Sequence, residues 1–231
     1  MVWEKCALTG RSSRLASAGR RSRLSFNVKR QVPTLRVAKN GQHLCTVGSA
    51  GIWMFSVHAW ADIWSEPATH LGITGGALHP DGKNDFLIWE MDHKLVKGDH
   101  LVFEFGEGEE ASRKPEVFDD EKAREEVQKE TPKWELPLSA ESIAEMESRP
   151  VLSPDIVWYL SKDATPKSAY RPGPGRQQLS LGLLWNNHRP ERIRLSLSST
   201  SLKEVIAREG GQDHVTEYVP IGTRIEFEIG A

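Results

Sequence analysis

The chain has little cysteine and no long apolar run, and each absence excludes a class of protein. The two cysteines among its 231 residues, Cys6 and Cys45, cannot build a disulfide framework or a cysteine-only zinc site. No apolar run approaches the roughly 20 residues of a membrane-spanning helix, and no apolar stretch near the start resembles a secretory signal. We therefore expect a soluble protein of a reducing compartment, the cytoplasm, without a membrane partner.

Specific catalytic signatures are also missing. The sequence contains no G-x-S-x-G nucleophile elbow, no phosphate-binding G-x-x-x-x-G-K-S/T, no H-E-x-x-H and no paired C-x-x-C. Cys45 lies in the middle of a strand-like run, where a cysteine is ordinarily an inert small hydrophobe. We recognise no named family in these motifs, and we expect no cofactor.

Acidic residues are absent between Glu4 and Asp62, and this divides the charge of the chain. Residues 1–31 carry eight basic residues and one acidic residue, whereas the rest carries 22 basic and 31 acidic residues. The basic segment is rich in Arg, Ser and Ala and cannot bury enough surface to offset its ordering entropy, so we expect it to be disordered. It could be a transit segment, a basic arm for nucleic acid or anionic lipid, or an extension from a misassigned start. The acidic remainder repels phosphate, which argues against a nucleic-acid partner.

Short runs of alternating apolar and polar residues begin at Val32 and are typical of β-strands. Asn40-Gly41 is a strong hairpin turn between two such runs. In a later run, Leu101, Phe103 and Phe105 share one face, which indicates a sheet with one buried side. Strands separated by frequent turns predict a compact antiparallel sandwich or barrel.

The second half of the chain repeats this pattern. When the chain is shifted on itself by 124 residues, residues 55–106 align with residues 179–230 without a gap, and seven positions are identical. The shared phase of the apolar positions matters more than the identities, because a slip of one residue would turn each strand over. We expect an internal duplication. The alternative is two unrelated strands that end in a common turn–strand pattern.

These patterns predict a mainly β fold of two tandem, similar antiparallel β-sandwich or barrel-like domains joined by a short helical connector. We assign the chain to four parts: a basic disordered N-terminal segment (1–31), a first β domain (32–108), a charged helical connector (109–150) and a second β domain (151–231).

Three short helices are expected within this plan. Residues 116–130 of the connector are rich in helix formers. Ser142 and Glu145 fit a capping box at the start of a second helix. Apolar residues at helical spacing predict a third helix over 201–208.

Histidine is concentrated in the first half of the chain, where six of the eight residues lie between positions 43 and 100. Imidazole is the commonest metal ligand, and several acidic residues lie nearby in sequence. The candidate metal ligands are His58, His70, His79 and His93. None has the tight spacing of a known ligand motif, and surface histidines explain the pattern as well. Asp99 and its neighbour His100 resemble solvated residues at a hairpin end.

Tryptophan is abundant, with eight residues in the chain. Core packing is one interpretation, and an aromatic platform for a sugar, a base or a peptide is the other. The candidate binding residues are Trp60, Trp64, Trp89 and Trp185, together with Asn187, His188 and Arg189 in the loop after Trp185.

The favoured function is therefore a non-catalytic binding or interaction protein whose partner is a protein or a carbohydrate. The two halves share the phase of their apolar positions but not their polar residues, which indicates a scaffold retained for its shape. Two alternatives stay open. One is a metal-dependent hydrolase that uses histidines of the first domain, and the other is nucleic-acid binding through the basic N-terminal arm.

Overall fold

The computed structural model describes most of the chain after its basic segment. The described residues are 32–48, 51–63, 69–108, 111–118, 139–163, 165–207 and 209–230. The segment 1–31, for which disorder is expected, lies outside them, as do residues 119–138 of the connector.

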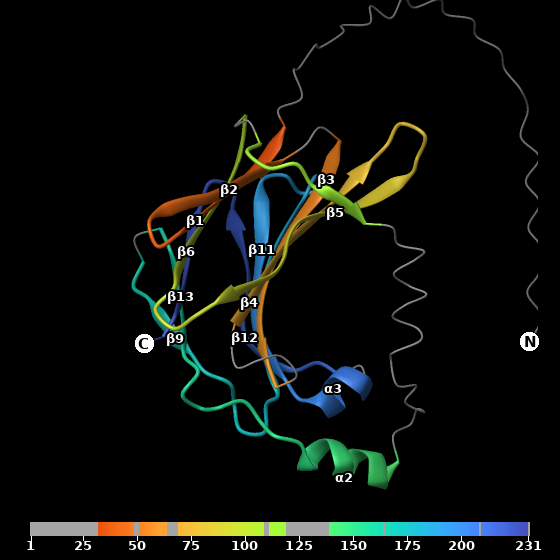
Figure 1. The fold of residues 1–231 in the computed structure, drawn as a ribbon, viewed down its shortest axis with the longest axis vertical. Helices are drawn as coiled ribbons and strands as arrows, with labels where there is room; N and C mark the ends of the chain where they lie inside the picture. The colour runs from red at the N-terminus through yellow and green to blue at the C-terminus, as the bar shows by residue number, and fades with distance from the viewer. Residues whose placement is uncertain are drawn as a thin grey trace, which may run out of the picture. The chain divides into compact units, whose positions relative to one another are not determined.

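Two antiparallel sheets build the described structure (Figure 1). Sheet A has six strands in the order β2 (Gln42–Gly48), β1 (Pro33–Lys39), β6 (His100–Glu107), β13 (Arg224–Ile229), β8 (Trp158–Lys162) and β9 (Ser168–Tyr170). Sheet B has seven strands in the order β12 (Gln212–Pro220), β11 (Arg192–Thr200), β10 (Gln178–Asn186), β3 (Ile52–Asp62), β4 (Thr69–Leu78), β5 (Asn84–Leu95) and β7 (Glu116–Phe118). The prediction of a mainly β, antiparallel fold is confirmed.

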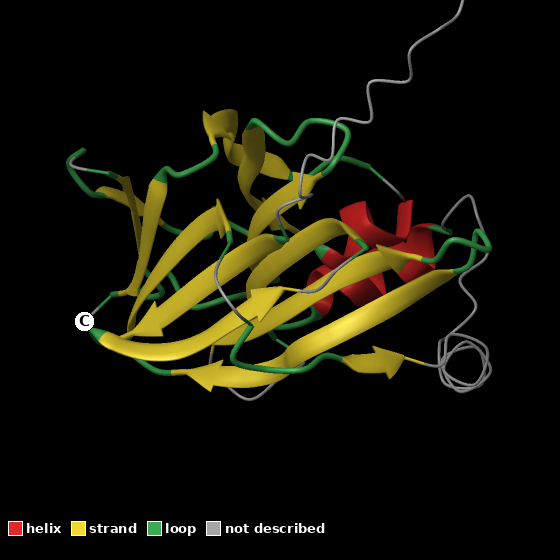
Figure 2. Cartoon of the chain, turned by 90° about the horizontal axis from the view of Figure 1, so that it is seen from above, coloured by secondary structure: helices red, strands yellow, loops and turns green. Residues whose placement is uncertain are grey.

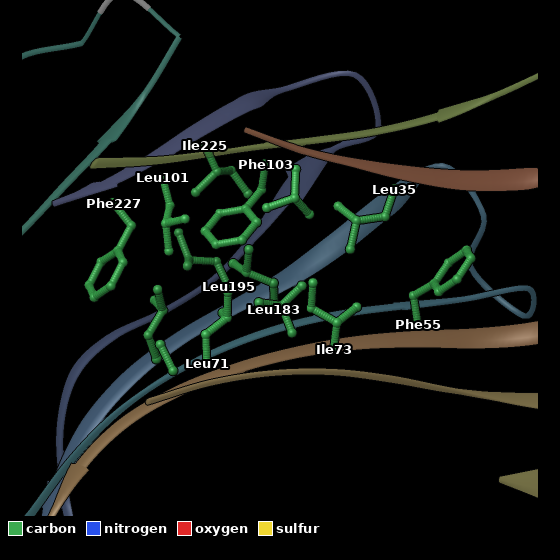
Figure 3. Close-up of a cluster of buried hydrophobic side chains, with 14 of the residues drawn as sticks. Leu35, Phe55, Leu71, Ile73, Leu101, Phe103, Leu183, Leu195, Ile225 and Phe227 are labelled. Carbon is green, nitrogen blue, oxygen red and sulfur yellow. The ribbon is translucent and has the colours of Figure 1, made fainter. Parts of the chain in front are cut away.

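The hydrophobic core lies between the two sheets. Figure 3 shows Phe103 and Ile225 of sheet A pointing toward Leu183 and Leu195 of sheet B. These side chains are fully buried because alternate residues of each strand face inward. Each large apolar side chain buried in this way stabilises the fold by about 1.5–3 kcal/mol. The prediction that Phe103 and its counterpart Phe227 are buried is confirmed.

Both sheets join strands from the two halves of the chain. Strand β6 pairs with β13 in sheet A, and β3 pairs with β10 in sheet B. The ranges expected as two tandem domains, 32–108 and 151–231, therefore interleave, and Gln31–Ala231 form one compact unit. A sheet must bury its apolar face against another layer and satisfy its backbone groups, and pairing across the halves does both.

The strand order of each sheet is symmetrical about its central pair when elements of the two halves are matched. Figure 2 shows that strands make up most of the described structure and that its helices lie together. The hairpin β1–β2 then corresponds to β8–β9, the run β3–β4–β5 to β10–β11–β12, and β6 to β13. Among the described strands, β7 alone has no counterpart; it pairs with β5 at the edge of sheet B.

The central pairs of both sheets also share one register. His58 pairs with Gly182 in sheet B, and Val102 pairs with Glu226 in sheet A, so the partners in both pairs are 124 residues apart. A shift of 124 residues therefore exchanges the partners within each pair.

Two turns repeat the same hydrogen bonds. Asn40 and Asp163 end β1 and β8 with positive φ angles of 54° and 50°. The Asn40 side chain accepts a hydrogen bond from the His100 N–H (2.8 Å), and the Asp163 carboxylate accepts one from the Arg224 N–H (2.9 Å). The backbone N–H of each turn residue donates to the carbonyl of the same partner. Asn and Asp tolerate this left-handed conformation better than other residues, which explains their presence here.

Helix α2 (Ala140–Ser148) forms where a second helix is expected, but the predicted capping box is wrong. The N-cap is Ser139, whose Oγ accepts a hydrogen bond from the Ser142 N–H at 3.0 Å. Ser142 therefore lies inside the first turn. Ser139 takes the role because its extended backbone leaves its hydroxyl beside the free N–H groups of that turn.

The other two expected helices have different outcomes. Helix α3 (Leu202–Ala207) confirms the third, and it contacts α2. The expected helix over 116–130 instead begins as the strand β7, and its remainder lies outside the described residues. The edge of β5 offers unpaired backbone groups, and Phe118 contacts Phe86 there (centroids 5.9 Å apart), so pairing prevails over helix propensity.

Asp99 is buried, which corrects its assignment as a solvated hairpin-end residue. Its carboxylate accepts hydrogen bonds from Lys39 Nζ (2.8 Å), Asn40 Nδ2 (2.8 Å) and the Val96 N–H (2.9 Å). Burial raises the pKa of Asp99, but these three hydrogen bonds outweigh burial and hold the pKa below its ordinary value. The carboxylate thus ties the β5–β6 turn to the end of β1.

We expect Asp99→Ala to lower the free energy of unfolding by about 1–3 kcal/mol at neutral pH, because three donors around a buried carboxylate lose their acceptor. The folded-state pKa is depressed, so this stabilisation is present above the unfolded pKa and is lost as the pH falls through the folded value. Urea denaturation of both proteins at about pH 7 and about pH 2.5 measures the difference, which should shrink in acid. The exposed Asp81→Ala is the control. A difference that does not change with pH would contradict this role for Asp99.

Candidate functional site

The outer faces of the two sheets differ in chemistry. On sheet A, Glu104 forms ion pairs with Arg36 (3.8 Å) and Arg224 (3.3 Å), and Arg224 also pairs with Glu226 (2.8 Å). Such a network of charged side chains is the ordinary surface of a solvated sheet.

The outer face of sheet B has no charged side chain over the middle of its central strands. Its outward positions alternate with the buried ones and are occupied mostly by small residues. They are Met54, Ser56, His58 and Trp60 of β3, His70, Gly72, Thr74 and Gly76 of β4, and Ser180, Gly182 and Leu184 of β10. On β4 the small residues let indole rings lie directly on the sheet, since an added Cβ would meet Trp60 at Gly72 and Trp53 at Gly76.

Three aromatic residues gather on this face, and we call them the Trp60 cluster: His58, Trp60 and His70. The Trp60 ring stacks on His58 (centroids 5.1 Å apart, planes at 22°) and on His70 (5.6 Å, 21°). It also reaches over Gly72, where an added Cβ would lie 3.4 Å from the indole ring. Trp60 and His70 face each other on paired strands, which explains the contact.

An acidic residue holds one imidazole of the Trp60 cluster. Asp92 Oδ1 lies 2.5 Å from His70 Nδ1, and His70 is buried. Asp92 has a φ of 63°, a left-handed conformation that is uncommon for a residue other than glycine. The irregular pairing of β4 with β5 near Leu71 accompanies this change of backbone direction. As at Asn40 and Asp163, the short polar side chain makes the left-handed conformation tolerable.

The other imidazole of the cluster has an altered pKa. The His58 side chain is exposed, but partial desolvation by its packed neighbours, with Trp60 stacked on its ring, lowers its pKa. A lowered pKa favours the neutral imidazole of His58 near pH 7, which offers one hydrogen-bond donor and one acceptor. The cluster is therefore an aromatic and hydrogen-bonding surface.

The structure brings together two of the four candidate metal ligands, His58 and His70. His79 instead lies 2.6 Å from Asp85 in the β4–β5 hairpin, and His93 lies on β5 opposite Leu71. Among the residues that the structure describes, no three His, Cys, Asp or Glu side chains converge in a way that could hold a metal ion.

Two of the candidate tryptophans lie in the core. Trp89 and Trp185 both contact Phe55, with centroid separations of 5.3 Å and 5.9 Å. The Trp185 indole N–H donates to the Pro190 carbonyl at 3.1 Å. Trp64 lies outside the described residues. Trp60 is thus the one member of the four that the described structure places on an outer face.

The candidate loop residues Asn187, His188 and Arg189 are exposed and close the β10–β11 hairpin. The His188 and Arg189 N–H groups donate to the side chain and the carbonyl of Asn186. The hairpin begins beside Met54, whereas Trp60 lies six residues further along β3, or about 20 Å away. These loop residues therefore do not join the Trp60 cluster.

The second half of the chain shows that the fold does not need the Trp60 cluster. At the shift of 124 residues, Trp60 corresponds to Leu184, His58 to Gly182 and His70 to Arg194. Both sets occupy matching positions in paired strands. The same framework thus stands with and without the aromatic residues. The sequence shifted by 124 residues already shows that the two halves differ here, because Trp60, His58 and His70 and their counterparts fall on outward positions of the strands.

Comparison of the chain with protein-family models, curated proteins and solved structures finds no match. No helix in the described part of the chain is long and apolar enough to cross a membrane. The site is therefore defined by its geometry, as an aromatic–imidazole cluster on the uncharged face of a two-sheet β protein.

We expect the imidazole of His58 to titrate below its ordinary range, and Trp60→Ala to move its pKa upward as the covering ring is removed. An NMR titration of the histidine ring signals measures both values. Tyr159→Ala, on the outer face of sheet A, is the matched aromatic control and should leave the value unchanged. An unshifted His58 in the Trp60→Ala variant would contradict the contact.

Proposed function

We propose that this protein is a non-catalytic binding protein built from two copies of one β unit. The matched strand order and the common separation of the central pairs, His58 with Gly182 and Val102 with Glu226, support the duplication. Two unrelated halves would not be expected to pair matched residues with each other at the centre of both sheets.

The observation that carries the binding function is the Trp60 cluster on one half of an otherwise matched face. The fold tolerates Leu184, Gly182 and Arg194 at the corresponding positions, so stability does not explain the cluster. The contact of Asp92 with His70 is also unnecessary for a simple sheet surface. Such features are retained where a surface makes specific contacts.

The partner that best fits this surface is a neutral carbohydrate. Aromatic rings pack against the apolar faces of sugar rings, while imidazole and serine groups exchange hydrogen bonds with the hydroxyls. The outward positions in the middle of the central strands carry no carboxylate or ammonium group, and the Asp92 carboxylate beside them is in contact with His70. Ser56 and Ser180 lie on the strands that carry or adjoin Trp60 and supply hydroxyl groups.

A protein partner is the second candidate, and the edge of sheet B favours it. In the described structure β5 is covered by β7, whereas its counterpart β12 has no strand on its outer side. An uncovered edge offers backbone groups to an added strand. Tyr218 of β12 is exposed and lies under the Arg192 guanidinium, 4.1 Å from the ring centroid.

The two alternative functions remain predictions. A hydrolase would need the candidate histidines to converge, and the described residues offer no such group. Nucleic-acid binding depends on residues 1–31, which lie outside the described structure.

Glycan-array binding by the full chain tests the proposed function. We expect neutral oligosaccharides to bind, and both Trp60→Ala and His58→Glu to weaken binding by about tenfold or more, or about 1.4 kcal/mol. His58 is exposed, so His58→Glu adds a charge to the face with little effect on folding. Tyr159→Ala is the matched control. Equal binding by all four proteins, or binding of no glycan, would contradict the carbohydrate proposal.

A further inference from the structure

A second tryptophan lies on the outer face of sheet B, at the opposite end of β3 from Trp60. Trp53 is half-buried, and an added Cβ at Gly76 would lie 2.5 Å from its indole Nε1. Gly76 pairs with the exposed Phe86, whereas its neighbour Ala77 is buried, so the missing Cβ of Gly76 points outward. The Trp53 indole therefore lies on the same face as the Trp60 cluster.

A β-bulge turns the Trp53 side chain to this face. The pairing of β3 with β4 slips between Ile52 and Met54, which makes Trp53 the extra residue. Strict alternation from the buried Phe55 would instead point Trp53 toward the core. The pairing of β10 with β11 has no such slip, and there the residue that corresponds to Trp53, Gln177, is buried.

Each outward tryptophan lies over a glycine of β4, and the second half of the chain has neither tryptophan nor glycine there. Trp60 reaches over Gly72, and Trp53 reaches over Gly76. A glycine within a strand weakens it, because it has no side chain to pack and is costly to order. At the shift of 124 residues, these four positions correspond in turn to Leu184, Ser196, Gln177 and Thr200. The two-sheet framework therefore does not need the tryptophan–glycine pairs.

Uncharged residues separate the two tryptophans. The outward positions of β3 and β4 between them carry no carboxylate or ammonium group. Ser56 and Thr74 pair with each other in the middle of this stretch and supply hydroxyl groups. Thr74 is midway between Gly72 and Gly76, which lie four residues apart, or about 13 Å along an extended strand. A single sugar ring is too small to contact both indoles.

Two hydrogen bonds hold Trp53 in place. Its Nε1 donates to Asn84 Oδ1 at 2.7 Å, and its carbonyl accepts from the Asn187 N–H at 2.8 Å. A side chain that is fixed before a ligand arrives loses less entropy on binding. Trp53 is therefore a pre-ordered aromatic surface at the far end of the face from the Trp60 cluster.

We propose that the Trp60 cluster and Trp53 together bind an extended, neutral, β-1,4-linked oligosaccharide that lies along β4. The inference rests on the proposed carbohydrate function and adds the length and shape of the ligand. Equatorial β-1,4 links join pyranose rings in a nearly straight chain, and each ring presents apolar C–H groups beside its hydroxyls. Sugar units at the two ends contact the tryptophans, and those between them exchange hydrogen bonds with Ser56 and Thr74.

Isothermal titration of the full chain with the β-1,4-linked sugars cellobiose, cellohexaose, mannobiose and mannohexaose tests the inference. In at least one of the two series, we expect the hexasaccharide to bind at least about tenfold more tightly than the disaccharide, because only the longer chain contacts both tryptophans. Trp53→Ala should remove most of this gain and leave the affinity for the disaccharide unchanged. Trp60→Ala should weaken the binding of both lengths, whereas the control, Tyr159→Ala, should weaken neither.

A double variant separates the Trp53 indole as a binding surface from the packing that it provides. Trp53→Ala combined with Gly76→Thr places a threonine where Thr200 stands in the second half, and no indole remains for its Cβ to meet. We expect this variant to resist urea at least as well as Trp53→Ala and still to lack most of the gain with chain length.

The outcomes distinguish this inference from the proposed function. If glycans on the array bind but neither hexasaccharide binds more tightly than its disaccharide, or if Trp53→Ala keeps the full gain, the inference is overturned and the proposed function stands. If neither the array nor the titrations detect binding, both are overturned. A gain that is present in the unaltered chain and lost in both Trp53 variants supports the inference.

Discussion

The pairing of β3 with β10 and of β6 with β13 is the constraint on which the rest of the structure depends. These two antiparallel pairs hold the halves of the chain together through backbone hydrogen bonds at the centre of each sheet. They also place inward residues of both halves, such as Phe103 and Leu183, opposite each other in one core.

The framework built on these pairs separates the positions that form the core from those on which the proposed binding depends. Inward positions keep large apolar side chains in both halves, with Leu71 and Leu195 as one matched pair. The outward positions around Trp60 differ between the halves, and so does the inward position of Ala61. Because the two halves share one strand order, each differing residue can be compared with the residue at the matched position of the other half.

Much of the fold could be predicted from local sequence. The alternation around Leu101, Phe103 and Phe105 places the buried face of β6 correctly, and Asn40-Gly41 marks the β1–β2 turn. Local pattern did not predict the burial of Asp99, because its three donors come from β1, the adjoining turn and the residue that ends β5. The cap of α2 was misplaced by one turn for a related reason, since Ser139 and Ser142 are equally good caps by composition.

The candidate site was predictable only in part. Tryptophan and histidine counts drew attention to Trp60, His58 and His70, but the same counts selected Trp89 and Trp185, which pack in the core. Composition does not tell an inward aromatic residue from an outward one. The phase of the strand does, and Trp60 is out of phase with the buried Phe55 whereas Trp185 is in phase with it.

The sequence by itself determined the strands, the faces that they bury and the matching phase of the two halves, because these follow from side-chain alternation over a few residues. Only the tertiary structure decided that the halves interleave in shared sheets and that His70 meets Asp92 beside Trp60. Those outcomes depend on pairings between residues far apart in the chain, and alternation within a strand carries no information about which other strand lies beside it.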